Sequence, residues 1–289
     1  MNDHRKLQDR VVVVTGADGG IGRAVCQLLA REGATLLAVA RRRASRELED
    51  TIQSASGKSF IIEADLEKAE SWNNVVIAAQ TRFRTIDTLV NCIGITNPKT
   101  FLELSQKEID KLVATNFGAT VCGIAAILPT MLRQKSGHII TIGSLGGIVP
   151  TPGDALYSAT KFAVRGLCFS LYEEMKQHGI DVSVISPGPV ETKMLDLVAA
   201  GGHSKLTFVY RPLDPENVAR AVLRVIEHPR REVILPRKAA WIALLVNHFP
   251  KAFDVLHPLL KVLGGVGIRR YRKNHRLTIP TQNWESSHV

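Results

Sequence analysis

The chain has 289 residues, of which 45% are hydrophobic and 22% charged, a composition that excludes an intrinsically disordered protein and suits one large domain or two small ones. Its formal net charge of +10 could indicate a nucleic-acid partner. However, +8 of this charge comes from nine basic residues and one acid between residues 237 and 276. The rest of the chain is nearly balanced, so we expect a basic C-terminal segment and no nucleic-acid partner.

The N-terminal segment MNDHRKLQDR has no apolar stretch of the kind found in secretory signals, so the sequence predicts a cytoplasmic protein. The four cysteines have no paired spacing and lie in apolar contexts, which predicts small core residues, with neither disulfides nor a metal site. They are Cys26, Cys92, Cys122 and Cys168.

Short apolar or β-branched runs alternate with stretches of helical length through the main body of the chain. Runs of this kind are typical of strands that are buried on both faces of a sheet. The expected strands are 11–15, 35–40, 59–64, 86–91, 138–143, 180–186 and 231–236. The alternation predicts an α/β fold with a parallel sheet covered by helices.

The first expected strand runs directly into TGADGGIG, residues 15–22, which opens the first expected helix. Glycines at 16, 20 and 22 permit a tight turn and let the backbone approach a pyrophosphate, while free N–H groups at the helix start face the phosphates. In this position between a strand and a helix, the pattern predicts a dinucleotide site.

The second expected strand ends at Ala40 and is followed by three arginines, Arg41 to Arg43. An NAD enzyme usually has an acid there for the ribose 2′-hydroxyl, whereas an arginine fork suits a 2′-phosphate. Cations at a helix N-terminus also oppose the helix dipole and need another reason to be there. The sequence therefore favours NADP(H), bound by Arg41 first and Arg42 second.

A tyrosine and a lysine four residues apart, Tyr157 and Lys161, share one face of an expected helix. A cation beside a phenol favours the phenolate, so we expect Lys161 to lower the pKa of Tyr157. Such a phenol is a candidate general acid/base near neutral pH.

Seven motifs occur in the same order as in the short-chain dehydrogenase/reductase family, which the chain resembles from about residue 7 to about residue 236. They are TGADGGIG, the pair Asp65-Leu66, NCIG (91–94), TNFG (115–118), Ser144, YSATK (157–161) and PGPVET (187–192). The family's usual NNAG is NCIG here, and Asn91 is retained.

The resemblance implies a Rossmann-type, doubly wound and mostly seven-stranded parallel sheet with helices on both faces. It implies that Tyr157 is the general acid/base, Ser144 binds the substrate oxygen, Lys161 holds the nicotinamide ribose and Asn116 anchors a water. With the charge argument, the expected cofactor-binding residues are Gly16, Asp18, Gly20, Ile21, Gly22, Arg41, Arg42, Asp65, Leu66, Asn91, Gly94, Tyr157, Lys161, Pro187, Gly188, Val190 and Thr192.

Two segments beyond the shared motifs bear on the substrate. Residues 193–211 are mostly apolar and are expected to form a mobile lid with possible hinges at Gly201 and Gly202.

The sequence divides into a catalytic domain, 1–236, and an apolar and basic helical extension, 237–289. The apolar runs of the extension are too short to span a membrane, so residues 239–276 are expected to form a lid, a subunit interface or a peripheral membrane contact.

These features predict an NADP(H)-dependent oxidoreductase that interconverts a hydrophobic secondary alcohol and its ketone. Two alternatives stay open: a 3-oxoacyl thioester reductase, and a non-catalytic protein that senses the cofactor or tethers to a membrane. We also expect a homo-oligomer.

Overall fold

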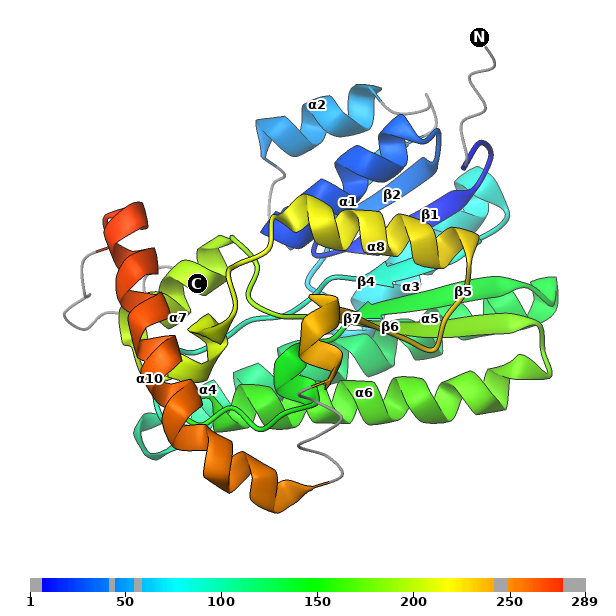
Figure 1. Ribbon diagram of the computed structural model, residues 1–289. Helices are drawn as coiled ribbons and strands as arrows, with labels where there is room; N and C mark the ends of the chain where they lie inside the picture. The colour runs from blue at the N-terminus through cyan, green and yellow to red at the C-terminus, as the bar shows by residue number, and fades with distance from the viewer. Residues whose placement is uncertain (1–6, 42–44, 55–58, 242–248, 278–289) are drawn as a thin grey trace, which may run out of the picture.

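The computed structural model describes residues 7–41, 45–54, 59–241 and 249–277. Seven parallel strands form one sheet in the order β3-β2-β1-β4-β5-β6-β7 (Figure 1). The strands are β1 (Val11–Thr15), β2 (Thr35–Ala40), β3 (Phe60–Glu63), β4 (Thr88–Asn91), β5 (Gly137–Ile142), β6 (Ile180–Pro187) and β7 (Glu232–Leu235). Each corresponds to one predicted run, so the predicted seven-stranded parallel sheet is confirmed.

Helices cover both faces of this sheet. They are α1 (Gly20–Arg31), α2 (Arg46–Ser54), α3 (Ala69–Phe83), α4 (Gln106–Val113), α5 (Ala119–Gln134), α6 (Ala155–Lys176), α7 (Lys193–Gly201), α8 (Pro215–Glu227) and α10 (Pro250–His275). One hydrophobic core joins α1, α2 and α8 to one face, and a second core joins α3, α5 and α6 to the other. Figure 1 shows these two layers on opposite sides of the strands.

The strand β1 shows why the apolar runs had no alternation of polar and apolar residues. Val12 and Val14 pack into the first core and Val13 into the second, and all three are completely buried. A strand in the middle of a parallel sheet has no solvent face, so the first four positions of β1 are all valine, without alternation. Burial of each valine side chain contributes roughly 1.5 kcal/mol or more.

The order of strands creates a crevice at the carboxyl edge of the sheet. From β1, the chain proceeds outward to β2 and β3 and then returns to β4 on the other side of β1. Where the strand order reverses in this way, the connections diverge and leave room for a ligand. The register pairs Thr15 with Asn91 and Asn91 with Thr141, so these polar strand ends lie next to one another beside the crevice.

One helical stretch, Gln106–Gln134, is long and apolar enough to span a membrane by length and composition. Its residues Ile124, Ile127 and Met131 belong to the second core, and Gly123 lies against the ring of Trp72 on α3. The apolar side chains of this stretch therefore pack against the sheet.

The predicted C-terminal helical extension is present as α10, which packs on α7 and on a short 3-10 helix, η4 (Lys205–Val209). Leu195, Ala199 and Phe208 of these two segments form a small third core with Ile268 and Tyr271 of α10. The extension thus lies over the predicted lid segment, 193–211. The proposed domain boundary at residue 236 stays a prediction.

Candidate active site

The turn between β1 and α1 has the backbone geometry that the glycine pattern predicts. Gly16 has a φ of +60°, which L side chains rarely adopt. A Cβ on Gly22 would collide with the carbonyl of Gly16, and one on Gly20 would collide with the side chain of Thr192. The N-cap of α1, Gly19, makes no side-chain capping hydrogen bond, so N–H groups of the first turn are free to bind an anion.

Asn91 supplies a second feature that suits a bound dinucleotide. Its side chain is almost fully buried at the end of β4, and its Oδ1 accepts a hydrogen bond from Thr15 Oγ1 at 3.4 Å. Its Nδ2 has no partner among the described residues. A buried donor without a partner is costly, so it indicates a site for a ligand acceptor. The glycine turn, the uncapped helix and this donor all fit a dinucleotide.

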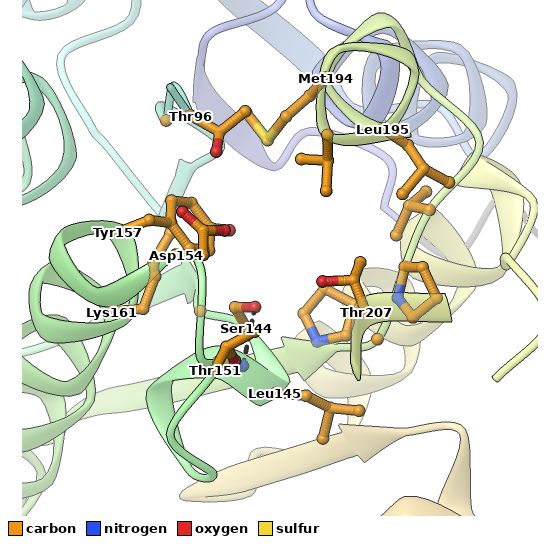
Figure 2. A pocket seen from close by; sticks show the side chains of 18 of the residues that line it. Thr96, Ser144, Leu145, Thr151, Asp154, Tyr157, Lys161, Met194, Leu195 and Thr207 are labelled. Carbon is orange, nitrogen blue, oxygen red and sulfur yellow. Dashed lines mark hydrogen bonds between the residues drawn. The ribbon is translucent and has the colours of Figure 1, made fainter. Parts of the chain in front are cut away.

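A cavity of about 200 Å³ opens beside this turn. Figure 2 shows side chains from several elements around it, with Ser144, Tyr157 and Lys161 on one side and Met194 and Leu195 of α7 opposite. The predicted site residues that line it are Ile21, Gly94, Ser144, Tyr157, Lys161, Pro187, Gly188, Val190 and Thr192. The cavity wall therefore joins the expected catalytic group to the segment after β6 and to the lid.

Ser144 follows β5 and caps a short 3-10 helix, Leu145–Gly147. Its Oγ accepts a hydrogen bond from the N–H of Gly146 at 3.1 Å, which leaves the hydroxyl proton for another acceptor. The hydroxyl of Ser144 also forms a hydrogen bond that favours the ionised form of Tyr157. Ser144 is thus close enough to Tyr157 for both to bind one substrate oxygen.

The expectation that Lys161 lowers the pKa of Tyr157 is wrong for this structure. Burial raises the pKa of Tyr157 to about 12; the hydrogen bond from Ser144 opposes this shift, and the charge of Asp154 adds to it. Lys161 Nζ lies 5.8 Å from the centre of the Tyr157 ring. Burial also lowers the pKa of Lys161 to about 8, so the cation is itself weakened.

The amine of Lys161 points back into the protein. Its Nζ donates a hydrogen bond to the carbonyl of Ile142 at 3.1 Å, and a Cβ on Gly94 would lie 3.3 Å from it. The side chain thereby occupies the space between β5 and the loop that follows β4. This placement suits the predicted contact with a cofactor ribose.

Asn116 lies in a π-helical turn, Ala114–Gly118, between α4 and α5. Its Oδ1 accepts from the N–H of Ile95 at 2.7 Å, and its Nδ2 donates to the Ile95 carbonyl and to Thr160 Oγ1. These bonds fix the loop after β4 against α6. Such π-turns are frequent at functional sites, but the sequence pattern did not predict this one. The predicted water-anchoring role stays a prediction.

The remaining cofactor candidates are not among the residues that line the cavity. Asp18 Oδ1 accepts from the N–H of Ser45 at 3.3 Å, and Arg41 Nη2 lies 3.9 Å from Glu67 Oε1. Asp65 and Leu66 follow β3. The side chain of Leu66 is buried in the second core, and its backbone carbonyl accepts a hydrogen bond from the indole N–H of Trp72 at 3.1 Å. Arg42 lies outside the described residues.

Several residues that line the cavity were missed by the sequence reasoning. Asp154 stands three residues before Tyr157 at the N-cap of α6, where an aspartate usually caps the helix. Its carboxyl makes no capping bond and lines the cavity next to Tyr157 (Figure 2). Burial raises the pKa of Asp154 to about 7, and the hydroxyl of Thr96 opposes the shift. The other missed residues include Thr96, Thr207, Ala239 and Leu260, and spacing in the sequence gives no indication of their contacts.

Comparison with known proteins agrees with this geometry. The family described as short chain dehydrogenase matches residues 10–201. An uncharacterized oxidoreductase of Staphylococcus saprophyticus is 35% identical over 234 residues, which are 79% of this chain and 94% of that protein. One of Listeria monocytogenes is 32% identical over 229 residues, 77% of this chain and 92% of that protein.

A solved structure of a short-chain dehydrogenase from Streptomyces avermitilis superposes with a TM-score of 0.73 at 26% identity, over 89% of this chain and 98% of that one. Levodione reductase, at 24% identity, shares the fold with a TM-score of 0.73. A parallel seven-stranded sheet, a glycine turn and a serine-tyrosine-lysine cavity define a nicotinamide-dependent oxidoreductase. The chain belongs to the short-chain dehydrogenase/reductase family.

Members of this family act on CH–OH groups with NAD(H) or NADP(H).

Proposed function

We propose that the protein is an NADP(H)-dependent oxidoreductase that interconverts a hydrophobic ketone and its secondary alcohol. The observation that carries the proposal is the cavity in which Ser144 and Tyr157 are accompanied by mostly apolar side chains. These include Leu145, Val149, Met194, Leu195, Val198 and Leu206. An apolar pocket with few polar groups selects a hydrophobic substrate and orients it by its oxygen.

The chain's own residues can position the substrate and move the proton. When bound, the nicotinamide cofactor supplies or accepts the hydride. Ser144 donates a hydrogen bond to the substrate oxygen, which stabilises the negative charge that develops there. Tyr157 has a pKa of about 12 and is protonated near neutral pH, so it can donate its proton to that oxygen. This protonation state suits the proton donation that ketone reduction requires.

The preference for NADP(H) rests on Arg41 at the end of β2. The Arg41 side chain is 43% exposed, and its contact with Glu67 is long, at 3.9 Å. Glu67 is already paired more closely with Lys111, at 2.7 Å, and accepts a hydrogen bond from Thr115. The guanidinium is therefore available for a phosphate, with which it forms strong charge-assisted bonds.

One set of assays tests the proposal. Oxidation of NADPH and NADH is followed with a panel of hydrophobic ketones and 3-oxoacyl thioesters. We expect turnover of ketones with NADPH, and a loss of at least about a hundredfold in Tyr157→Phe, the scale of removing a general acid. Tyr172→Phe, on the same helix but packed in the second core, should keep its activity. Faster turnover of the thioesters than of the ketones would show that the protein is a 3-oxoacyl thioester reductase instead.

Arg41→Ala in the same assays tests the cofactor. Loss of a charged hydrogen bond should weaken NADPH binding by about tenfold or more and leave NADH binding nearly unchanged. Arg31→Ala, which removes an exposed arginine at the far end of α1, is the matched control. Equal losses for both cofactors would make Arg41 structural, and preference of the parent protein for NADH would refute the NADP(H) proposal.

A further inference from the structure

The helix α10 has an exposed apolar face. Its large exposed side chains are Val255, Leu259, Val262, Leu263 and Val266, each between 49% and 78% exposed. At about 100° per residue, these positions fall within roughly a third of the circumference of the helix. Figure 1 shows α10 at the margin of the molecule beside α7. Clustered exposed apolar residues of this kind mark an interaction surface.

Basic residues continue the same face toward the end of the helix. Arg269, Arg270 and Lys273 are exposed and lie within about 120° of circumference together with the apolar positions. Among the described side chains of α10, none on this face is acidic. Trp241 and Phe249, which precede the helix, are 77% and 64% exposed. We call this combination of apolar and basic residues on α10 the outer face.

The opposite side of α10 is fixed to the segment that walls the cavity. Gly264 and Gly267 lie so close to the carbonyls of Lys205 and Phe208 on η4 that a Cβ on either would collide with them. Tyr271 donates a hydrogen bond to Asp196 of α7 at 2.8 Å.

Two further contacts join α10 to the lid and the cavity. Arg272 Nε donates to the carbonyl of Ala199 at 2.6 Å, so the C-terminal end of α7 is held as well. Leu260 itself lines the cavity. A surface that binds the outer face would therefore lie one helix diameter, about 10 Å, from the substrate site.

We propose that the outer face of α10 docks on an anionic lipid surface and holds the mouth of the cavity beside it. Apolar residues followed by cations are the pattern by which a helix lies in a membrane interface, with its apolar face among the acyl chains and its cations at the headgroups. Exposed aromatic residues add anchors at the level of the headgroups. On the proposed function, this placement would let a hydrophobic ketone pass from the bilayer into the cavity.

The charges favour a lipid surface over a second copy of the chain. Two outer faces packed in parallel would bring two cationic clusters together. Packed antiparallel, they would set each cluster against apolar side chains of the other copy. Neither arrangement neutralises the cations, whereas anionic headgroups do.

The test measures flotation of the full chain with vesicles of phosphatidylglycerol or of phosphatidylcholine, at low and high salt. We expect binding to phosphatidylglycerol that weakens as salt rises. Replacing Arg269, Arg270 and Lys273 with Gln should weaken it by about a hundredfold, from about fivefold for each cation near the surface. Replacement of the exposed cations Arg31, Lys107 and Lys176 with Gln is the charge-matched control and should bind as the parent does.

A second pair of variants tests the apolar part. Val262→Gln with Val266→Gln should also weaken binding, whereas Ile77→Gln, at a 60% exposed position on α3, should not. Turnover of a water-soluble ketone should be unchanged in all of them, so vesicle binding is read independently of the proposed reaction. Absence of binding to phosphatidylglycerol vesicles at low salt would overturn the proposal. So would outer-face variants that bind vesicles normally but change the oligomeric state, because the face would then be an interface between copies.

Discussion

Asp154 places an acid beside the expected proton donor. Its pKa is raised to about 7 by burial, and its charge raises the pKa of Tyr157. Below about pH 7 the carboxyl is neutral and can accept or donate a hydrogen bond within an apolar cavity. Above it, a carboxylate forms against apolar side chains and disfavours an uncharged ketone.

We therefore expect kcat/KM for a hydrophobic ketone to fall as pH rises through about 7, because the ionised form of Asp154 binds the ketone less well. In Asp154→Asn this decline should disappear. A decline near pH 8 that persists in the variant would belong to Lys161, whose pKa is about 8. Measurement of pH profiles for both proteins checks this, and identical profiles would show that Asp154 does not titrate in this range.

The packing of α10 on η4 depends on the close approach of their two backbones. Two glycines of α10 allow the effect of this contact to be distinguished from the effect of helix propensity. Gly267→Ala would press a methyl group on the carbonyl of Phe208, whereas Gly265→Ala meets nothing within 4 Å. Both changes raise helix propensity by up to about 1 kcal/mol. We expect Gly265→Ala to stabilise the protein, and Gly267→Ala to loosen α10 and raise KM for the ketone. Urea unfolding and steady-state kinetics check this, and equal effects would contradict the close approach.

Elements differed in how well the sequence predicted them. The inner strands, such as β1 and β2, were predictable because they are buried on both faces, which leaves a run of apolar residues. The edge strands β3 and β7 are only partly buried, and they were predictable because their short runs are rich in β-branched residues. The helix α10 was expected only as an interrupted apolar run, 252–268, because Asp254, His257, Pro258 and Lys261 break the pattern. The observed helix continues through Pro258 to His275. Its continuity depends on contacts with η4 and α7, which are tertiary and leave no periodic pattern in the sequence.

The same limit applies to the candidate site. Ser144, Tyr157 and Lys161 could be identified by motif, and they do line one cavity. The raised pKa of Tyr157 could not be predicted from the motif, because it is caused by burial of the phenol, which is a property of the whole fold. Asp154 was missed for a local reason, since an aspartate before a helix usually serves as its cap.

At the scale of the whole molecule, the buried His138 links folding to pH. It lies on β5 with Nε2 2.8 Å from Ser183 Oγ of β6, and burial lowers its pKa from 6.5 to about 4. In the unfolded chain the imidazole binds a proton near pH 6.5, whereas in the folded chain it does so only near pH 4. Its contribution to the free energy of unfolding is therefore complete above about pH 6.5 and is lost as pH falls toward 4.

Asp154 acts in the opposite direction, because its folded pKa is raised and folding is favoured as pH falls below about 7.

Variants of His138 separate its effect on stability from that of Asp154. We expect His138 to cost the parent protein about 2 kcal/mol between pH 7 and pH 5, at about 1.4 kcal/mol for each pH unit below 6.5. In His138→Gln this part of the loss should vanish, even if the variant is less stable at pH 7. His178→Gln, which replaces an exposed histidine after α6, should keep the parent's pH dependence. Urea unfolding of the three proteins at the two pH values gives one difference in the free energy of unfolding for each protein. A loss in His138→Gln as large as in the parent would show that another group controls stability in acid.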